Sequence, residues 1–242
     1  MPIGRSEVAA AFADPLAERL WTARAESRVL APDGGWSEVD LARAERIAAQ
    51  LYLGAGADRA VAWKLGALDR ASRTRLGLNG PLVAPVLPDR LHLDATSVTL
   101  NREEFVQPRF EPEVGLVLDS PGADPRVAAC IEIADCRFPG WLPPPGVAVA
   151  DFGLQGAMVF GPACLAVGEV AVLVRHDGRE VADARSSLAE VTARLDLVRP
   201  LLAGSAGPAH IATGAMTALL DAAPGTWEFD FTGATTVAVT LT

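Results

Sequence analysis

The strongest constraint on this chain is a change in sequence period near residue 81. From there to the C-terminus, short apolar runs alternate with polar residues and stop at Gly, Pro or Asp, which is typical of β-strands joined by turns. Asp177-Gly178 lies between two such runs and predicts a β-hairpin. One amphipathic helix over 187–197 and a shorter helix over 214–222 are expected to interrupt the strands.

The first 80 residues are instead predicted to be mostly helical. Asp14 followed by Pro15 is a typical helix start, and Ser37 or Asp40 caps a second segment with apolar residues at helical spacing. A strand over 60–68 and a short helix over 70–76 follow. The predicted fold class is therefore α+β, with a small helical N-terminal part over 1–80 and a β-rich body over 81–242 in one integrated domain.

Composition excludes several classes of function. The 242 residues are 50% hydrophobic, enough for a sizeable core, and carry a net charge of −9 without any basic cluster, which argues against a nucleic-acid partner. No apolar run reaches the roughly 18 residues of a membrane helix, and residues 1–15 lack the apolar stretch of a signal peptide. Three cysteines without CxxC spacing fit a reducing cytoplasm.

Two glutamates open one of the apolar strands. Glu111 and Glu113 are two residues apart, so on a strand their carboxylates share a face a few ångströms apart. Like charges at that distance raise one pKa unless a cation lies between them. Pro112 removes a backbone donor, which favours a strand edge or a strand start.

Two further charged residues interrupt apolar strands. Glu132 lies between Ile131 and Ile133, and alternation puts it on the face opposite to both isoleucines. Lys64 shares a face with small residues in the sequence AWKLG. Three carboxylates and one ammonium balance a divalent cation, and oxygen-only ligands favour Mg²⁺ or Mn²⁺ with positions left for substrate.

Each of these features also has a simpler interpretation. A Glu-x-Glu pair at a strand start is common on a solvated edge that binds nothing. Glu132 fits an exposed strand face, and a lysine between apolar residues often extends its ammonium to water.

Several motifs, taken in chain order, resemble the fumarylacetoacetate hydrolase superfamily, and within it the 2-oxopent-4-enoate hydratase and 4-oxalocrotonate decarboxylase branch. The resemblance covers nearly the whole chain and implies a β-rich mixed-sheet roll of that superfamily's C-terminal-domain type. The segments that carry it are AWKLG (62–66), RTRLGLNGP (73–81), RFEPEVGLVL (109–118), IEIADCR (131–137), DFGLQGAMVFG (151–161) and IATG (211–214).

The resemblance also implies roles for single residues. Glu111, Glu113 and Glu132 would hold Mg²⁺ or Mn²⁺. Lys64 would move a proton at the substrate, with its pKa lowered, and Asp151 would be a second catalytic residue that orients Lys64 or a metal-bound water. The implied substrate-binding residues are Leu82, Arg137, Phe152, Gln155 and Thr213.

The implied function is that of a metal-dependent lyase, a hydratase or decarboxylase, acting on a 2-oxo acid or its dienol through a metal-stabilised enolate. Homo-oligomers are common in this superfamily, so a homo-oligomer is expected. Positions that are polar in the family hold Leu82, Phe152, Leu154, Gln155 and Ala209, which favours a larger or more apolar substrate. The alternatives are a C–C bond hydrolase of acylpyruvate type and a repurposed superfamily member, either isomerising, cyclising or non-catalytic.

Overall fold

Two β-sheets make up most of the chain in the computed structural model, which describes residues 12–55, 60–165, 168–202 and 207–242. The larger sheet has the strand order β2-β1-β10-β5-β6-β7-β3 with β11 paired to β5, and the smaller sheet has the order β4-β13-β12-β8-β9. The strands are β1 (Ala62–Gly66), β2 (Leu82–Pro85), β3 (Leu91–His92), β4 (Ser97–Leu100), β5 (Pro108–Leu118), β6 (Arg126–Asp135), β7 (Gln155–Phe160), β8 (Glu169–His176), β9 (Arg179–Ser187), β10 (Ala209–Ala215), β11 (Leu220–Asp221), β12 (Gly225–Thr232) and β13 (Thr236–Leu241).

Alternation along β5 and β6 separates a core face from a site face. Ile131 and Ile133 lie in the main hydrophobic core together with residues of both sheets, as the sequence predicts. From β5, Phe110 reaches across to the smaller sheet, where its ring lies 4.9 Å from that of Trp227 and 5.4 Å from that of Phe229. The intervening residues of β5 and β6 therefore face away from this core.

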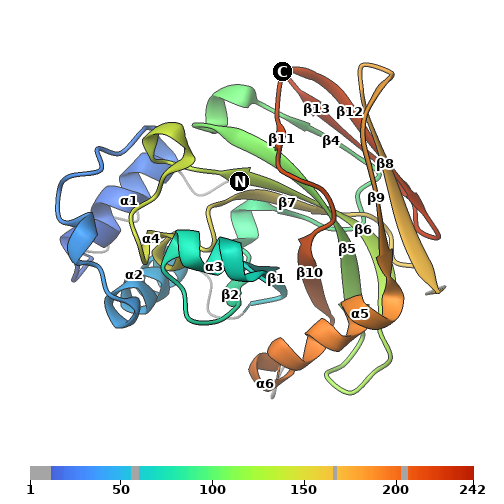
Figure 1. Ribbon diagram of the computed structural model, residues 1–242, viewed down its shortest axis with the longest axis horizontal. Coiled ribbons are helices and arrows are strands. Elements are labelled where there is room, and N and C mark those ends of the chain that lie inside the picture. Colours follow the sequence, from blue (N-terminus) through green and yellow to red (C-terminus); the bar gives the residue numbers. More distant parts are fainter. Residues whose placement is uncertain (1–11, 56–59, 166–167, 203–206) are drawn as a thin grey trace.

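The helices begin at the residues that the sequence indicates. The side chains of Asp14, Asp40 and Asp69 accept hydrogen bonds from backbone N–H groups of the first turns of α1, α2 and α3. The helices are α1 (Pro15–Ala25), α2 (Leu41–Gly54), α3 (Arg70–Leu76), α4 (Val147–Ala150), α5 (Leu188–Ala193) and α6 (Arg199–Leu202). Helices α1 to α4 gather on one side of the molecule, away from β8, β9, β12 and β13 (Figure 1).

The N-terminal helices share a core with a later part of the chain. Leu20 of α1 and Ile47 of α2 belong to one buried cluster with Phe138 and Phe152. Strand β1 also joins the larger sheet, parallel to β10 and antiparallel to β2. The N-terminal part is thus packed into the same body, and the boundary at residue 80 stays a prediction.

The α+β fold class is confirmed, and so is the hairpin at Asp177-Gly178, which joins β8 to β9. The helix predicted over 214–222 is wrong. Gly214 belongs to β10, and Leu220 of β11 pairs with Phe110 of β5. None of the described helices is long and apolar enough to cross a membrane. Residues 1–11, on which most of the signal-peptide prediction depends, lie outside the described residues.

Candidate metal centre and pocket

Neighbouring strands bring the three glutamates together. Glu111 lies directly opposite Glu132 in the antiparallel pairing of β5 and β6, and Glu113 lies one step further along the same face of β5. One oxygen from each of the three carboxylates lies within 4.8 Å of the others. The predicted convergence of acidic side chains from two segments is therefore present.

Only some of the carboxylate oxygens have hydrogen-bond partners in the protein. Glu113 Oε2 accepts a 2.6 Å hydrogen bond from the backbone N–H of Gly214, at an irregular step in β10 where φ is +98° and glycine is favoured. Glu113 Oε1 and Glu132 Oε2 are buried and have no hydrogen-bond partner among the described residues. Buried carboxylate oxygens without partners cost free energy, and a cation would supply the missing ligand contact.

The crowding of negative charge raises the pKa of two of the glutamates. Burial first, and then the charge of Glu132, raise the pKa of Glu111 to about 7. Burial and the same neighbouring charge raise the pKa of Glu113 well above its usual range. The site as described therefore favours binding of positive charge, whether protons or a cation.

Lys64 is the cation that the protein itself supplies. Its ammonium, buried on β1, donates hydrogen bonds to Glu132 Oε1 and, over 2.9 Å, to the carbonyl oxygen of Gly153. Burial alone would lower the pKa of Lys64, but the charges of Glu132 and Glu111 outweigh it, so that its pKa is raised. The raised pKa follows from the surrounding carboxylates, and the lowered pKa beside a bound cation stays a prediction.

The raised pKa values predict how stability depends on pH. The folded protein binds protons at Glu111 and Glu113 more tightly than the unfolded chain, whose glutamates titrate near pH 4.3, so stability from this pair falls as pH rises between about 5 and about 7. His92 and His210, whose pKa values burial lowers, act in the opposite direction.

The measurement is therefore a comparison of urea unfolding in EDTA at pH 5 and pH 7. The wild type is expected to lose more stability over this interval than the double variant Glu111→Gln/Glu113→Gln. Saturating Mg²⁺ is expected to remove the difference. Equal pH dependence of the two proteins in EDTA would contradict the prediction.

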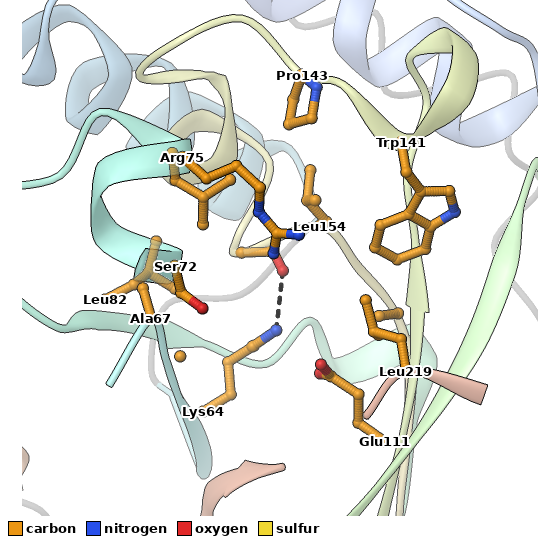
Figure 2. A pocket seen from close by; sticks show the side chains of 14 residues that line it. Lys64, Ala67, Ser72, Arg75, Leu82, Glu111, Trp141, Pro143, Leu154 and Leu219 are labelled. Atoms are coloured by element: carbon orange, nitrogen blue, oxygen red, sulfur yellow. Dashed lines mark hydrogen bonds between the residues drawn. The ribbon is translucent and has the colours of Figure 1, made fainter. Parts of the chain in front are cut away.

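A pocket opens beside the cluster, with Lys64 and Glu111 at one end (Figure 2). Trp141 forms one wall; its indole N–H donates to the Gln107 carbonyl oxygen at 2.9 Å, and the Arg109 guanidinium lies 4.6 Å from its ring centre. The remaining lining residues are Gly66, Ala67, Ser72, Arg75, Leu76, Leu82, Ala134, Pro143, Gly153, Leu154 and Leu219. Most of these residues are apolar, and one of them, Arg75, carries a guanidinium group.

Asp151 does not touch the pocket. It is fully buried, with Oδ1 2.6 Å from an Arg24 nitrogen and Oδ2 2.5 Å from an Arg137 nitrogen. Arg137 also donates to the carbonyl oxygens of Asp135 and Gln155. Both residues are therefore engaged in a buried ion-pair network, and the substrate-binding role of Arg137 stays a prediction without support from these contacts.

Of the other predicted substrate-binding residues, only Leu82 lines the pocket. Phe152 packs in the helical core against Tyr52. The side-chain oxygen of Gln155 accepts from the Leu87 N–H, and the hydroxyl of Thr213 donates to the Val114 carbonyl oxygen. The side chains of Phe152, Gln155 and Thr213 thus bond or pack within the scaffold, and their substrate-binding roles stay predictions.

Sequence reasoning missed two arginines. Arg75 extends from α3 toward the middle of the pocket in Figure 2, and Arg24 comes from α1. Arg75 lies in the short helix that follows the Lys64 strand, so its place near Lys64 could have been inferred from the sequence. Nothing local in the sequence pairs Arg24 with Asp151, 127 residues away.

No protein-family model matches the chain, and no curated protein matches it in sequence. Solved structures do resemble it. The 4-oxalocrotonate decarboxylase of Pseudomonas putida G7, complexed with magnesium and adipate, has a TM-score of 0.77 at 19% identity, over 94% of this chain and 96% of that one. The fumarylpyruvate hydrolase of Pseudomonas aeruginosa, complexed with Mn²⁺ and pyruvate, has a TM-score of 0.52 at 12% identity, over 74% and 88%.

A 5-carboxymethyl-2-hydroxymuconate delta-isomerase from Mycobacterium smegmatis has a TM-score of 0.53 at 14% identity, over 75% of this chain and 78% of that one. These neighbours are members of the fumarylacetoacetate hydrolase superfamily. The chain therefore has the fold that its sequence motifs imply.

Proposed function

We propose that this chain is a divalent-metal-dependent lyase of the hydratase or decarboxylase type, acting on a 2-oxo acid or its dienol. The observation that carries the proposal is the cluster of Glu111, Glu113 and Glu132, which includes two buried oxygens without partners and lies beside the Lys64 ammonium. Three carboxylates and one ammonium leave two negative charges, which Mg²⁺ or Mn²⁺ would neutralise. The magnesium-bound decarboxylase neighbour supports the same choice of metal.

Glu111, Glu113 and Glu132 would hold the cation. When bound, it would supply Lewis acidity toward the carboxylate and keto oxygens of a 2-oxo acid, which favours loss of a proton from the adjacent carbon. The cation would offset the carboxylate charges that raise the pKa of Lys64, so that Nζ, once it has lost its own proton, would accept the substrate proton and return it, with Glu132 and the Gly153 carbonyl fixing its position. Leu82 and Leu154 would keep water from the reacting carbon.

Two observations favour a lyase over a C–C bond hydrolase. A hydrolase of the acylpyruvate type needs a base for water, often a histidine paired with a glutamate. None of the described residues that line the pocket is a histidine. The structural likeness to the decarboxylase, with a TM-score of 0.77, also exceeds that to the fumarylpyruvate hydrolase, at 0.52.

The test is proton exchange, which requires no knowledge of the natural substrate. We expect the wild type with Mg²⁺ to catalyse exchange of the C3 protons of 2-oxobutyrate with D₂O, followed by proton NMR. EDTA is expected to stop the exchange and oxalate to inhibit it by competition. Failure of the Mg²⁺-loaded protein to exchange these protons would overturn the proposal.

The homo-oligomer and the cytoplasmic location remain predictions.

Arg75 is expected to favour substrates that carry a second carboxylate. Its side chain lines the pocket and acts on Glu111 electrostatically, and among the described residues no carboxylate forms an ion pair with it. A charge-assisted hydrogen bond contributes about 1.5–3 kcal/mol, so Arg75→Met is expected to raise the KM for 2-oxoadipate about tenfold. The KM for 2-oxohexanoate, which has an uncharged end, is expected to change little.

The matched control is Arg70→Met, an exposed arginine on the same helix that does not line the pocket. Both KM values are measured by C3 proton exchange. An equal rise for the two acids in Arg75→Met would contradict a role in carboxylate recognition.

A further inference from the structure

The Lys64 ammonium depends on a short turn for one of its two hydrogen bonds. That turn joins α4 to β7, and its Gly153 carbonyl oxygen accepts from Lys64 over 2.9 Å. A Cβ atom on Gly153 would lie 2.7 Å from a Leu82 methyl carbon and 3.0 Å from Lys64 Nζ. The turn therefore approaches Lys64 as closely as a glycine allows.

This turn has an unfavourable backbone conformation. Phe152, Gly153 and Leu154 have φ values of +52°, +70° and +63° in succession. Two of these residues are not glycine, and each such residue costs on the order of 1 kcal/mol or more, so the surrounding structure must hold the conformation.

Buried ion pairs supply that support. Arg137 bonds to Asp151 at the start of the turn and to the Gln155 carbonyl oxygen at its end. Arg24 approaches from α1, 2.6 Å from the other oxygen of Asp151 and 5.7 Å from the ring centre of Phe152. The two arginines thus bind the two carboxylate oxygens of Asp151 at the start of the turn.

We propose that Arg24 is a positioning residue for Lys64, acting through Asp151 and the turn 151–154. This inference rests on the proposed function of Lys64 as the group that moves the proton. Arg24 touches neither the pocket nor the carboxylate cluster, so it acts only through the conformation of the turn. The N-terminal helical layer is, by this inference, part of the catalytic apparatus.

The test compares Arg24→Met with Arg43→Met. The control removes another ion pair of the same helical layer, more exposed, between Arg43 and Asp14 at 2.7 Å, which does not contact the turn. In hydrogen–deuterium exchange, peptides covering 148–156 are expected to exchange at least about tenfold faster in Arg24→Met only, as expected for local opening. Peptides from β5 and β6 are expected to be unchanged in both variants.

Catalysis gives the second readout. The kcat for C3 proton exchange of 2-oxobutyrate is expected to fall about 10- to 100-fold in Arg24→Met, as for a small misplacement of a reacting group. The KM and the Mn²⁺ affinity, measured from the electron paramagnetic resonance of free Mn²⁺, are expected to stay within about twofold. Arg24→Lys, which retains a cation, is expected to recover most of the kcat.

Each outcome decides the question. Unchanged protection of 148–156 in Arg24→Met, or equal loss of kcat in both variants, overturns the proposal. If Arg24→Met does not fold, Arg24→Gln is compared with Arg43→Gln by the same measurements, and equal behaviour overturns it. A wild type without exchange activity refutes the proposed function, whereas the deuterium labelling still tests whether Arg24 holds the turn.

Discussion

Glu132→Gln is expected to lower Mn²⁺ affinity by about a hundredfold or more and to abolish metal-dependent proton exchange. Removing one partner from a buried charge contact costs roughly 3–5 kcal/mol, and each 1.4 kcal/mol corresponds to about a tenfold change in affinity. Glu132 is fully buried between Glu111 and Lys64, so no water replaces the lost carboxylate oxygen easily.

The measurement is a Mn²⁺ titration followed by paramagnetic resonance, with calorimetry as a check. Glu228→Gln is the matched control, since it makes the same change on a strand of the other sheet. A Glu132→Gln protein that binds Mn²⁺ as tightly as the wild type would show that the carboxylate cluster is not the metal site.

Lys64→Met is expected to abolish proton exchange without weakening metal binding. Loss of a general acid–base group lowers the rate about 10²- to 10⁴-fold, so C3 proton exchange is expected to be nearly lost. Mn²⁺ affinity is expected to hold or increase, because the Lys64 ammonium and the cation compete for Glu132. The methionine fills a similar volume, which limits the change in packing.

The two readouts together separate catalysis from metal binding. A Lys64→Met protein that loses both Mn²⁺ binding and proton exchange would indicate that Lys64 maintains the cluster instead of moving a proton. Undiminished exchange in the variant would exclude Lys64 from the reaction.

The strand alternation made the carboxylate cluster predictable. Once β5 and β6 are placed in the sequence, the two-residue period puts Glu111, Glu113 and Glu132 on faces opposite to their apolar neighbours. That they share one face of one sheet follows from the pairing of the two strands. The helix starts at Asp14 and Asp40 were predictable for a similar reason, since capping depends on a few adjacent residues.

The parts that escaped prediction depend on tertiary packing. Arg24 finds Asp151 only when α1 packs against α4 and the turn after it, and no local pattern encodes that contact. Segment 214–222 contains helix-forming residues, but pairing with β5 overrides their preference. The sequence also did not show that the side chains of Phe152 and Gln155 pack or bond within the scaffold, away from the pocket.

The buried amine on β1 has one practical consequence. Lys64 is the sole lysine among the 242 residues, whose other basic side chains are all arginines or histidines. Reductive methylation with ¹³C-formaldehyde can therefore label, apart from the chain's own α-amino group, one side chain only. The methyl resonance of the labelled Lys64 would report on the pocket that this residue lines. The rate of labelling would depend on how often the buried amine becomes accessible to solvent.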